Sequence, residues 1–296
     1  MLLLTGATGR VGSALLRRLI ARREPVRCLV RDPRRLGPER VRVQIALGDL
    51  GVPASFRHAL RGVRTVVHLA ATERDQPHAT IEEVDGVAVW RLLRAAERAG
   101  VEHFVFVSPL GATPYHRARL HRAKALAEEA VAGAALRTTT LRCSLIYSPG
   151  DRRLALLDLL ASLLPVVPVT GTMARARSQP IWSEDVAACV AAALDRSGDQ
   201  QHEHFELAGP EAVSHREAVE VALRAAGRPR RLLALPSGVI LRGLAAYEAL
   251  TGPVAIATRD EADLLAATML TARGTADAEA LGVTPHRMAD VLAGAA

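Results

Sequence analysis

The sequence is poor in lysine and in aromatic residues, and both shortages limit what the protein can bind. Of the 38 Lys and Arg residues only Lys124 is a lysine, which leaves 38 − 1 = 37 arginines. Aromatic residues make up 3% of the chain, so few rings are available to stack on nucleic-acid bases. The net charge of +7 comes from arginines scattered along the chain rather than from a basic patch. We expect no nucleic-acid partner.

Cysteines are few as well. Cys28, Cys143 and Cys189 lie in separate apolar runs, a spacing that fits no metal site, and we expect buried, reduced thiols. The histidine pair in "HEH" (202–204) has no further ligand cluster nearby, so we interpret it as a solvated strand edge. We expect no metal.

The chain also lacks a long apolar run. The best candidate, residues 154–169, contains Asp158 and two prolines and is too short to cross a bilayer. A glycine turn that starts at Gly6 leaves no room for a signal peptide before it. We expect a cytoplasmic protein without a membrane span, either a monomer or a homodimer.

Short runs that are apolar on both faces alternate with segments of helical periodicity. We predict strands at 1–5, 25–31, 41–49, 64–71, 101–108 and 137–147, and helices at 11–23, 53–62, 80–100, 114–132 and 153–164. This alternation is typical of an α/β fold with a doubly wound, Rossmann-type parallel sheet.

The alternation weakens after residue 144. We predict a Rossmann-type domain from residues 1–143 and about 179–200. Residues 144–178 and 203–296 would form a smaller, mainly helical substrate domain that is interleaved with it. One short strand is expected there, at 204–209.

The segment "TGATGRVG" (5–12) lies between the first strand and the first helix. Gly6 allows a tight turn, Gly9 lets a pyrophosphate approach the backbone, and Gly12 lets the helix pack closely on the sheet. The alternative is a turn with no ligand, but the flanking strand and helix favour a dinucleotide site. The residues predicted to bind the cofactor here are Gly6, Thr8, Gly9, Arg10, Val11 and Gly12.

The end of the second strand decides which dinucleotide is bound. An NAD site places an acid there to bind the ribose hydroxyls, whereas this chain has Arg31, whose guanidinium suits a 2′-phosphate. Asp32 follows and would favour NAD. However, it precedes Pro33 and is better explained as a turn or helix cap. We predict NADP(H) rather than NAD.

Eight segments resemble the extended and atypical short-chain dehydrogenases/reductases, above all the NmrA-like and complex I accessory-subunit-like NAD(P)H-binding groups. In chain order they are "TGATGRVG", "LVRDP", "GDL", "VVHLAA", "FVFVSPLGA", "HRAKALAEEAV", "LRCSLIYSPGD" and "QPIWSEDVA". The resemblance is strongest over residues 1–210. It implies the superfamily but no particular reaction.

The resemblance implies roles for individual residues. Asp49 and Leu50 would meet the adenine, and Ala70 and Ala71 would line the cofactor cleft. Cys143 stands where the family has proline, at the wall beside the nicotinamide.

The same resemblance identifies catalytic candidates. Ser108 stands at the place of the family's catalytic serine. Lys124 matches the last residue of Tyr-x-x-x-Lys, where it would hold the nicotinamide ribose. The alternative for Lys124 is an exposed ion pair with Glu128, one helical turn away. The tyrosine of this motif is replaced by Leu120, so Tyr115 and His121 are the substitute acids that we consider.

These features favour an NADPH-dependent oxidoreductase. Its small-molecule substrate would be apolar or aromatic, namely a carbonyl, enone or quinone-like compound. The rival hypothesis, based on Leu120, is a non-catalytic NAD(P)H-binding redox sensor or assembly protein. A sugar-nucleotide epimerase is a weaker alternative because that chemistry relies on the missing tyrosine.

Overall fold

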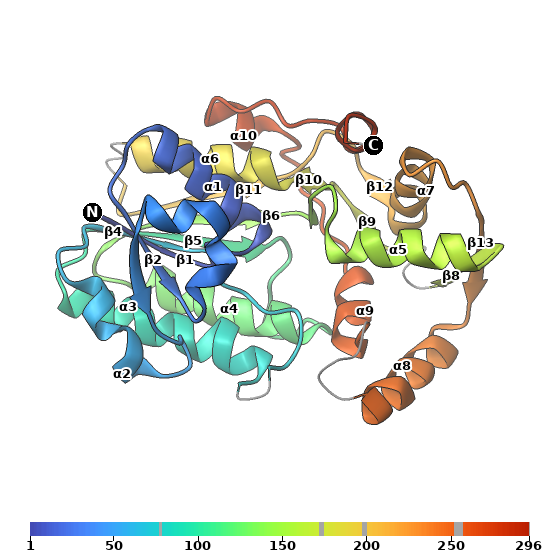
Figure 1. Ribbon diagram of the computed structural model, residues 1–296, viewed down its shortest axis with the longest axis horizontal. Coiled ribbons are helices and arrows are strands. Elements are labelled where there is room, and N and C mark those ends of the chain that lie inside the picture. Colours follow the sequence, from blue (N-terminus) through green and yellow to red (C-terminus); the bar gives the residue numbers. More distant parts are fainter. Residues whose placement is uncertain (77–78, 172–174, 197–199, 252–256, 296) are drawn as a thin grey trace.

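The protein is described from a computed structural model that covers residues 1–76, 79–171, 175–196, 200–251 and 257–295. Its centre is a seven-stranded sheet in the order β11-β6-β5-β4-β1-β2-β3, with every neighbouring pair parallel (Figure 1). The strands are β1 (Leu2–Thr5), β2 (Val26–Val30), β3 (Gln44–Leu47), β4 (Thr65–His68), β5 (His103–Pro109), β6 (Arg137–Cys143) and β11 (His202–Leu207). The predicted α/β, Rossmann-type sheet is confirmed.

Helices cover both faces of this sheet (Figure 1). On one face α1 (Arg10–Ala21) lies beside α6 (Ser183–Asp195). On the other face lie α3 (Ala88–Arg98) and α4 (Arg119–Ala132). The short elements between strands are η1 (Pro33–Val41), α2 (Pro53–Phe56), η2 (Arg57–Leu60) and η3 (Glu83–Val87). A parallel sheet needs such cover because both of its faces are apolar.

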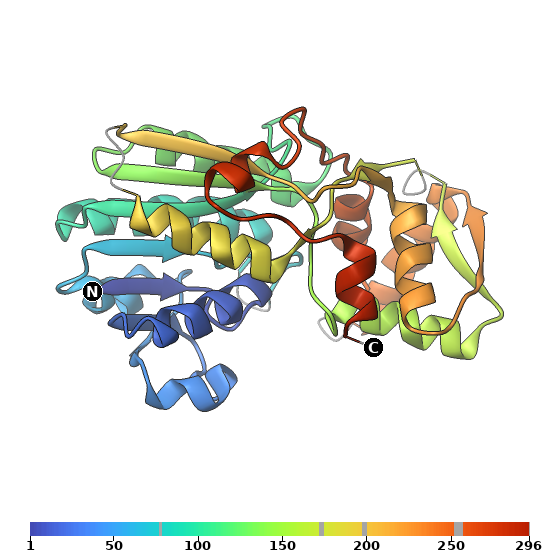
Figure 2. The ribbon, with the colours of Figure 1, turned by 90° about the horizontal axis from the view of Figure 1, so that it is seen from above.

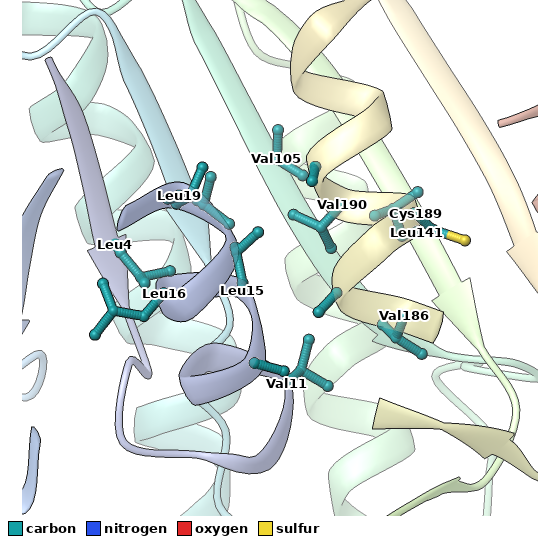
Figure 3. Close-up of a cluster of buried hydrophobic side chains, with 14 of the residues drawn as sticks. Leu4, Val11, Leu15, Leu16, Leu19, Val105, Leu141, Val186, Cys189 and Val190 are labelled. Carbon is teal, nitrogen blue, oxygen red and sulfur yellow. The ribbon is translucent and has the colours of Figure 1, made fainter. Parts of the chain in front are cut away.

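The core between α1, α6 and the sheet shows why these segments fold together (Figure 3). Leu15 and Leu19 on α1 point toward Val190 on α6, with Val105 of β5 beneath them. All four side chains are fully buried. Cys189 and Cys143 belong to the same cluster, as expected of small buried hydrophobic residues.

A second group of elements lies beside the sheet (Figure 2). Its helices are α5 (Arg152–Leu163), α7 (His215–Ala225), α8 (Ser237–Thr251), α9 (Arg259–Leu265) and α11 (Met288–Ala293). Three short strand pairs accompany them: β7 (Ile146–Tyr147) with β10 (Ile181–Trp182), β9 (Arg177–Ser178) with β12 (Val213–Ser214), and β8 (Val166–Thr170) with β13 (Arg231–Leu235). Among the described residues, no helix is both long and apolar enough to cross a bilayer.

Two segments expected in this second group belong to the sheet instead. β11 pairs with β6 along its whole length and forms the sheet's edge, where His202 and His204 are exposed. The helix α10 (Ala276–Ala280) packs on β11, and Ala278 joins the core beneath α1. Residues 203–207 and 276–280, which we expected in the substrate domain, therefore contribute to the sheet and its core. The division of the rest into two domains stays a prediction.

Two predicted helices differ in detail. The helix predicted at 80–100 contains the π-helical turn η3, and it ends before Gly100, which has a φ of 74°. The helix predicted at 114–132 begins only at Arg119, so Tyr115 lies in the preceding loop.

Candidate functional site

A cavity of about 420 Å³ lies at the carboxyl ends of β1, β4, β5 and β6. The strand order reverses between the neighbouring strands β1 and β4: β2 and β3 lie on one side of β1, and β4, β5 and β6 lie on the other. Open α/β sheets bind their ligands at such a reversal. The cavity is lined by Gly6, Gly9, Arg10, Val11, Gly12, Leu69, Ala71, Thr72, Glu73, Arg74, Gln76, Val107, Ser108, Pro109, Leu120, Lys124, Cys143, Ser144, Leu145, Ile146, Arg152, Arg153, Glu261, Leu264 and Met269.

The three glycines of the first turn meet different steric demands. Gly6 has a φ of 73°, and a Cβ there would lie 2.5 Å from the backbone nitrogen of Ala70. A Cβ on Gly12 would lie 2.0 Å from the carbonyl oxygen of Gly6. Both positions therefore need glycine for the fold itself.

Gly9 differs because its missing side chain leaves room on the cavity side. The nearest protein atom to a Cβ at Gly9 would be the Gly6 oxygen, at 3.2 Å. Gly9 is the N-cap of α1 and makes no side-chain hydrogen bond, so the first N–H groups of that helix remain available to bind a ligand. This turn fits a pyrophosphate. Of the other turn residues, Arg10 and Val11 line the cavity, whereas Thr8 does not.

Lys124 is buried in the cavity wall, and its side chain is only 4% exposed. Its Nζ lies 3.1 Å from Oδ1 of Asp85 and donates to the Val107 carbonyl oxygen at 3.3 Å. The same atom sits 4.7 Å from the centre of the Phe106 ring, a favourable position for a cation. Two oxygen contacts leave one N–H of the ammonium for a ligand in the cavity.

The π-helical turn η3 brings Asp85 to this position. Gly86 faces α4 closely, and a Cβ there would lie in van der Waals contact with the Ala123 oxygen, at 3.4 Å. The Asp85 side chain is fully buried and also accepts a hydrogen bond from the Thr72 backbone N–H at 2.9 Å. Burial raises the pKa of Asp85, and Lys124 opposes that rise. Asp85 belongs to no motif of the sequence and was not predicted as a site residue, although π-helical turns are frequent at functional sites.

The alternative explanation of Lys124 is wrong. Glu128, one turn away on α4, pairs with Arg142 at 2.7 Å and not with Lys124. All three contacts of Lys124 are made by its single Nζ atom, a compact charge on a flexible stem, whereas an arginine would present a planar fork of donors. We therefore expect lysine rather than arginine to fit this position.

Two buried polar groups accompany Lys124. The Ser108 hydroxyl lines the cavity and has no hydrogen-bond partner among the residues that the structure describes. His68 bonds through Nδ1 to the Thr5 hydroxyl at 2.9 Å, and its ring lies near Phe106. Burial, assisted by Lys124, lowers the pKa of His68 to about 3, so the ring is neutral at neutral pH.

The structure separates the two substitute acids from the cavity. Tyr115 is 95% exposed on the loop before α4. His121 is fully buried and stacks on His116 at 4.0 Å, and burial lowers its pKa to about 4. Neither residue lines the cavity, whereas Leu120 does. Cys143 also lines it, as the resemblance implied.

The residues expected around the adenosine half lie outside this cavity. Arg31 is exposed directly after β2, and Asp32 caps η1 by accepting a hydrogen bond from the Arg34 N–H. Asp49 and Leu50 follow β3, with the Asp49 carboxylate bonded to the Gly51 N–H. These segments share the carboxyl edge of the sheet with the glycine turn. Of the residues expected after β4, Ala71 lines the cavity and Ala70 backs Gly6.

The rim of the cavity carries charges that the sequence analysis did not single out. Glu73 contacts Arg10 at 3.0 Å and Arg153 at 3.4 Å. Glu261 on α9 contacts Arg74 at 2.7 Å and Arg152 at 3.2 Å. These residues are far apart in the chain and belong to no motif, so only the fold brings them together.

The chain is similar to known NAD(P)H-binding proteins. A family described as NAD(P)H-binding matches residues 6–197. The NAD(P)H azoreductase of Xenophilus azovorans is 28% identical over 236 residues, covering 79% of this chain and 77% of the relative. A (4-alkanoyl-5-oxo-2,5-dihydrofuran-3-yl)methyl phosphate reductase of Streptomyces griseus is 32% identical over 238 residues, covering 78% and 76%.

A third relative belongs to a larger assembly. It is the mitochondrial NADH dehydrogenase (ubiquinone) 1 alpha subcomplex subunit 9 of Arabidopsis thaliana, 30% identical over 227 residues. The match covers 73% of this chain but only 55% of that protein.

Among solved structures, the NADPH-dependent quinone oxidoreductase QOR2 of Escherichia coli, in complex with NADPH, has a TM-score of 0.75 at 18% identity. The match covers 99% of both chains. At that identity the likeness concerns the fold. The family match over residues 6–197 shows that the chain belongs to the NAD(P)H-binding family.

Proposed function

We propose that the protein is an NADP(H)-dependent reductase of a small, largely apolar enone, quinone-like or other carbonyl compound. The observation that carries this proposal is one continuous cavity that joins the glycine turn to Ser108 and Lys124. Leu120, Leu145 and Met269 give it an apolar wall. Reductases among the relatives support the same class of reaction.

Several residues of the chain would hold the cofactor. The open space at Gly9 and the N-terminus of α1 suit the pyrophosphate, and exposed Arg31 suits a 2′-phosphate. The third N–H of Lys124 and the unpartnered Ser108 hydroxyl suit the ribose and the reacting carbonyl. When bound, the nicotinamide would supply the hydride.

Leu120 limits which substrates can react. An unactivated ketone would become an alkoxide, a strong base that needs an acid beside it in the transition state. Leucine cannot donate that proton. An enone or quinone takes up hydride to give a delocalised anion, which water can protonate later. The site therefore favours these activated acceptors.

A second candidate function rests on the same residue. Leu120 also suits a protein that binds NADPH without turnover and presents it to a partner, as a sensor or assembly protein would. Relatives named photosystem II assembly factors make this alternative worth testing.

The first experiment measures cofactor choice. Titration calorimetry should give a tighter dissociation constant for NADPH than for NADH. The Arg31→Ala variant should lose about tenfold in NADPH affinity, as expected for a hydrogen bond between charged groups. Arg23→Ala, at another exposed arginine near the end of α1, is the control. Equal affinities for the two cofactors would refute the NADP assignment.

The second experiment measures turnover. NADPH oxidation should be seen with 1,4-naphthoquinone and not with cyclohexanone, and Leu120→Tyr should raise the rate with cyclohexanone. NADPH binding without oxidation by any acceptor would favour the non-catalytic alternative.

A further inference from the structure

A group of arginines lies where α5, α7 and the β8–β13 pair come together, at the end of the molecule away from the central sheet (Figure 1). Arg224 belongs to α7. Arg230 and Arg231 belong to the segment "RPRR" (228–231), which ends at the start of β13. All three arginines line one hollow of the surface. Although arginines are scattered along the chain as a whole, the fold gathers these three.

The charge of these arginines is not compensated. Among the residues that the structure describes, the side chains of Arg224 and Arg231 have neither a hydrogen bond nor an ion pair. Within the same part of the chain, Arg230 donates only to two backbone carbonyl oxygens. Of the described residues that line the hollow, only Glu220 is acidic, and it is paired with Arg216 at 3.1 Å. Three positive charges therefore remain.

Exposed leucines lie directly beside these arginines. Leu163 and Leu164, at the end of α5, are 71% and 40% exposed. They line a second hollow that also contains Arg230 and Arg231. Leu233, which is 52% exposed, follows two residues after Arg231 on β13, so the two side chains lie on the same face of that strand. A surface that combines exposed leucines with uncompensated arginines indicates a partner that is both apolar and negatively charged.

We propose that this surface binds an anionic lipid bilayer. We call it the arginine–leucine surface, and it comprises Leu163, Leu164, Arg224, Arg230, Arg231 and Leu233. The guanidinium groups would bind lipid phosphates, and the leucines would enter the boundary between headgroups and acyl chains. One weak signal gives only marginal membrane binding, whereas apolar groups together with a basic patch give stable binding.

A nucleic acid is the other common polyanion that arginines bind. Proteins that bind single strands stack the bases on aromatic rings, and no aromatic side chain is found among the described residues that line either hollow. The exposed leucines would also find no apolar partner on a phosphate backbone. The arginine–leucine surface therefore fits a bilayer better. It shares no residue with the lining of the cavity, so the proposal does not depend on the cofactor or the substrate.

Flotation with lipid vesicles tests the proposal on the whole chain. The protein is mixed with phosphatidylcholine vesicles that contain either no anionic lipid or about 30% phosphatidylglycerol. It should bind the anionic vesicles at least about tenfold more strongly, since each arginine near such a surface contributes about fivefold to the affinity. Binding should weaken as the salt concentration rises.

Two variants separate the contribution of charge from that of apolar contact. Arg230→Gln/Arg231→Gln should weaken binding to anionic vesicles about 25-fold, or about fivefold for each arginine. Leu163→Ser leaves the charge unchanged and should weaken binding about tenfold, because the leucine no longer enters the bilayer. Arg40→Gln/Arg42→Gln is the matched control. It removes the same charge from two exposed arginines at the end of η1, outside the arginine–leucine surface, and should change binding by less than about twofold.

Four results would overturn the proposal: no binding to anionic vesicles, equal binding to neutral and anionic vesicles, an equal loss in the control variant, or unchanged binding of Leu163→Ser, which would indicate adsorption by charge alone. A fluorescent DNA oligonucleotide is titrated in parallel. DNA binding that depends on Arg230 and Arg231, without vesicle binding, would assign the surface to a nucleic acid instead. All variants should keep the circular dichroism spectrum of the parent, because every substituted side chain is exposed.

Discussion

The pair of Lys124 and Asp85 shows how strongly one residue depends on its partner. Both side chains are buried, so removing one of them leaves the charge of the other buried and without its partner. Such a loss costs about 3–5 kcal/mol, whereas an exposed pair contributes about 1 kcal/mol or less. Lys124 therefore supports the fold as well as the proposed cofactor site, which separates it from an ordinary surface lysine.

A double-mutant cycle tests this pair. Lys124→Met and Asp85→Asn should each lower the free energy of unfolding by several kcal/mol, and the double variant should lose less than the sum. The same cycle on Arg216 and Glu220, an exposed ion pair one turn apart on α7, is the control and should give a coupling of at most about 1 kcal/mol. Additive losses for Lys124 and Asp85 would contradict the pairing.

The stability that the Lys124→Met variant loses should also depend on pH. Without its cation, Asp85 keeps a raised pKa because of burial. When the pKa of a carboxyl group is higher in the folded than in the unfolded state, the folded protein becomes less stable as pH rises. The deficit relative to the parent protein should therefore grow between pH 5 and pH 8, as measured by urea unfolding.

Variants at two glycines of the first turn test cofactor binding and folding separately. Gly9→Val should leave the protein folded and abolish NADPH binding, because the new side chain enters the cavity where the pyrophosphate is expected. Gly12→Val is the contrasting variant and should destabilise the protein, since its Cβ would collide with the Gly6 oxygen. Circular dichroism and calorimetry distinguish the two. Normal NADPH binding by Gly9→Val would mean that this turn serves the fold alone.

At the level of single elements, the local sequence pattern predicted whether a segment is a helix or a strand. It did not predict which other segments that element contacts. The six predicted strands and the glycine turn follow from apolar runs and a motif of eight residues, both visible in the sequence. The start of α4 was placed five residues too early because Pro114 suggests a first helical turn. The π-helical turn η3 has no signature in a sequence, and so Asp85 was not predicted.

The helix α9 depends on residues that are distant in the chain. Asp260 contacts Arg119, the first residue of α4, at 3.0 Å, and Asp263 contacts Arg117, in the loop before α4, at 3.2 Å. Glu261 adds the contacts to Arg74 and Arg152. Apolar packing of Leu264 against Leu110 and Met269 supplements these pairs. No periodicity of α9 itself could have predicted that it closes one end of the cavity.

The contribution of these ion pairs to α9 can be measured. Arg119→Gln removes contacts to Asp260, Asp75 and Glu82 together, and partly exposed pairs contribute about 0.2–1 kcal/mol each. Amide hydrogen exchange in α9 should therefore become several-fold faster, while α6 on the opposite face of the sheet remains unchanged. Equal acceleration in both helices would indicate global destabilisation instead.

Across the whole molecule, the edge strand shows the limit of prediction from sequence. Residues 203–207 come after the irregular stretch and were expected in the substrate domain, yet they belong to β11, which completes the sheet beside β6. Nothing local distinguishes a strand that returns to the sheet from one that pairs elsewhere. The pairing depends on the exposed edge that β6 presents once the rest of the sheet has formed.

Buried histidines distributed over the molecule make its stability depend on pH. Burial lowers the pKa of His68 to about 3, and that of His103 and His121 to about 4, from an ordinary value of 6.5. Below pH 6.5 the unfolded chain takes up protons at these positions and the folded protein does not. Stability is therefore present above pH 6.5 and falls as the pH is lowered toward 4.

The size of this effect can be measured by urea unfolding at pH 7, 6 and 5. Each histidine can remove up to about 1.4 kcal/mol per pH unit below 6.5. Asp260 and Glu261, whose pKa values burial raises, act in the opposite sense because they bind protons more tightly in the folded protein. Between pH 5 and pH 7 the effect of the histidines on stability should be larger than that of the two carboxyl groups. His121→Phe removes one titrating group and should make the decline shallower. A parent protein equally stable at all three pH values would mean that these rings are charged, and therefore hydrated, in the folded state.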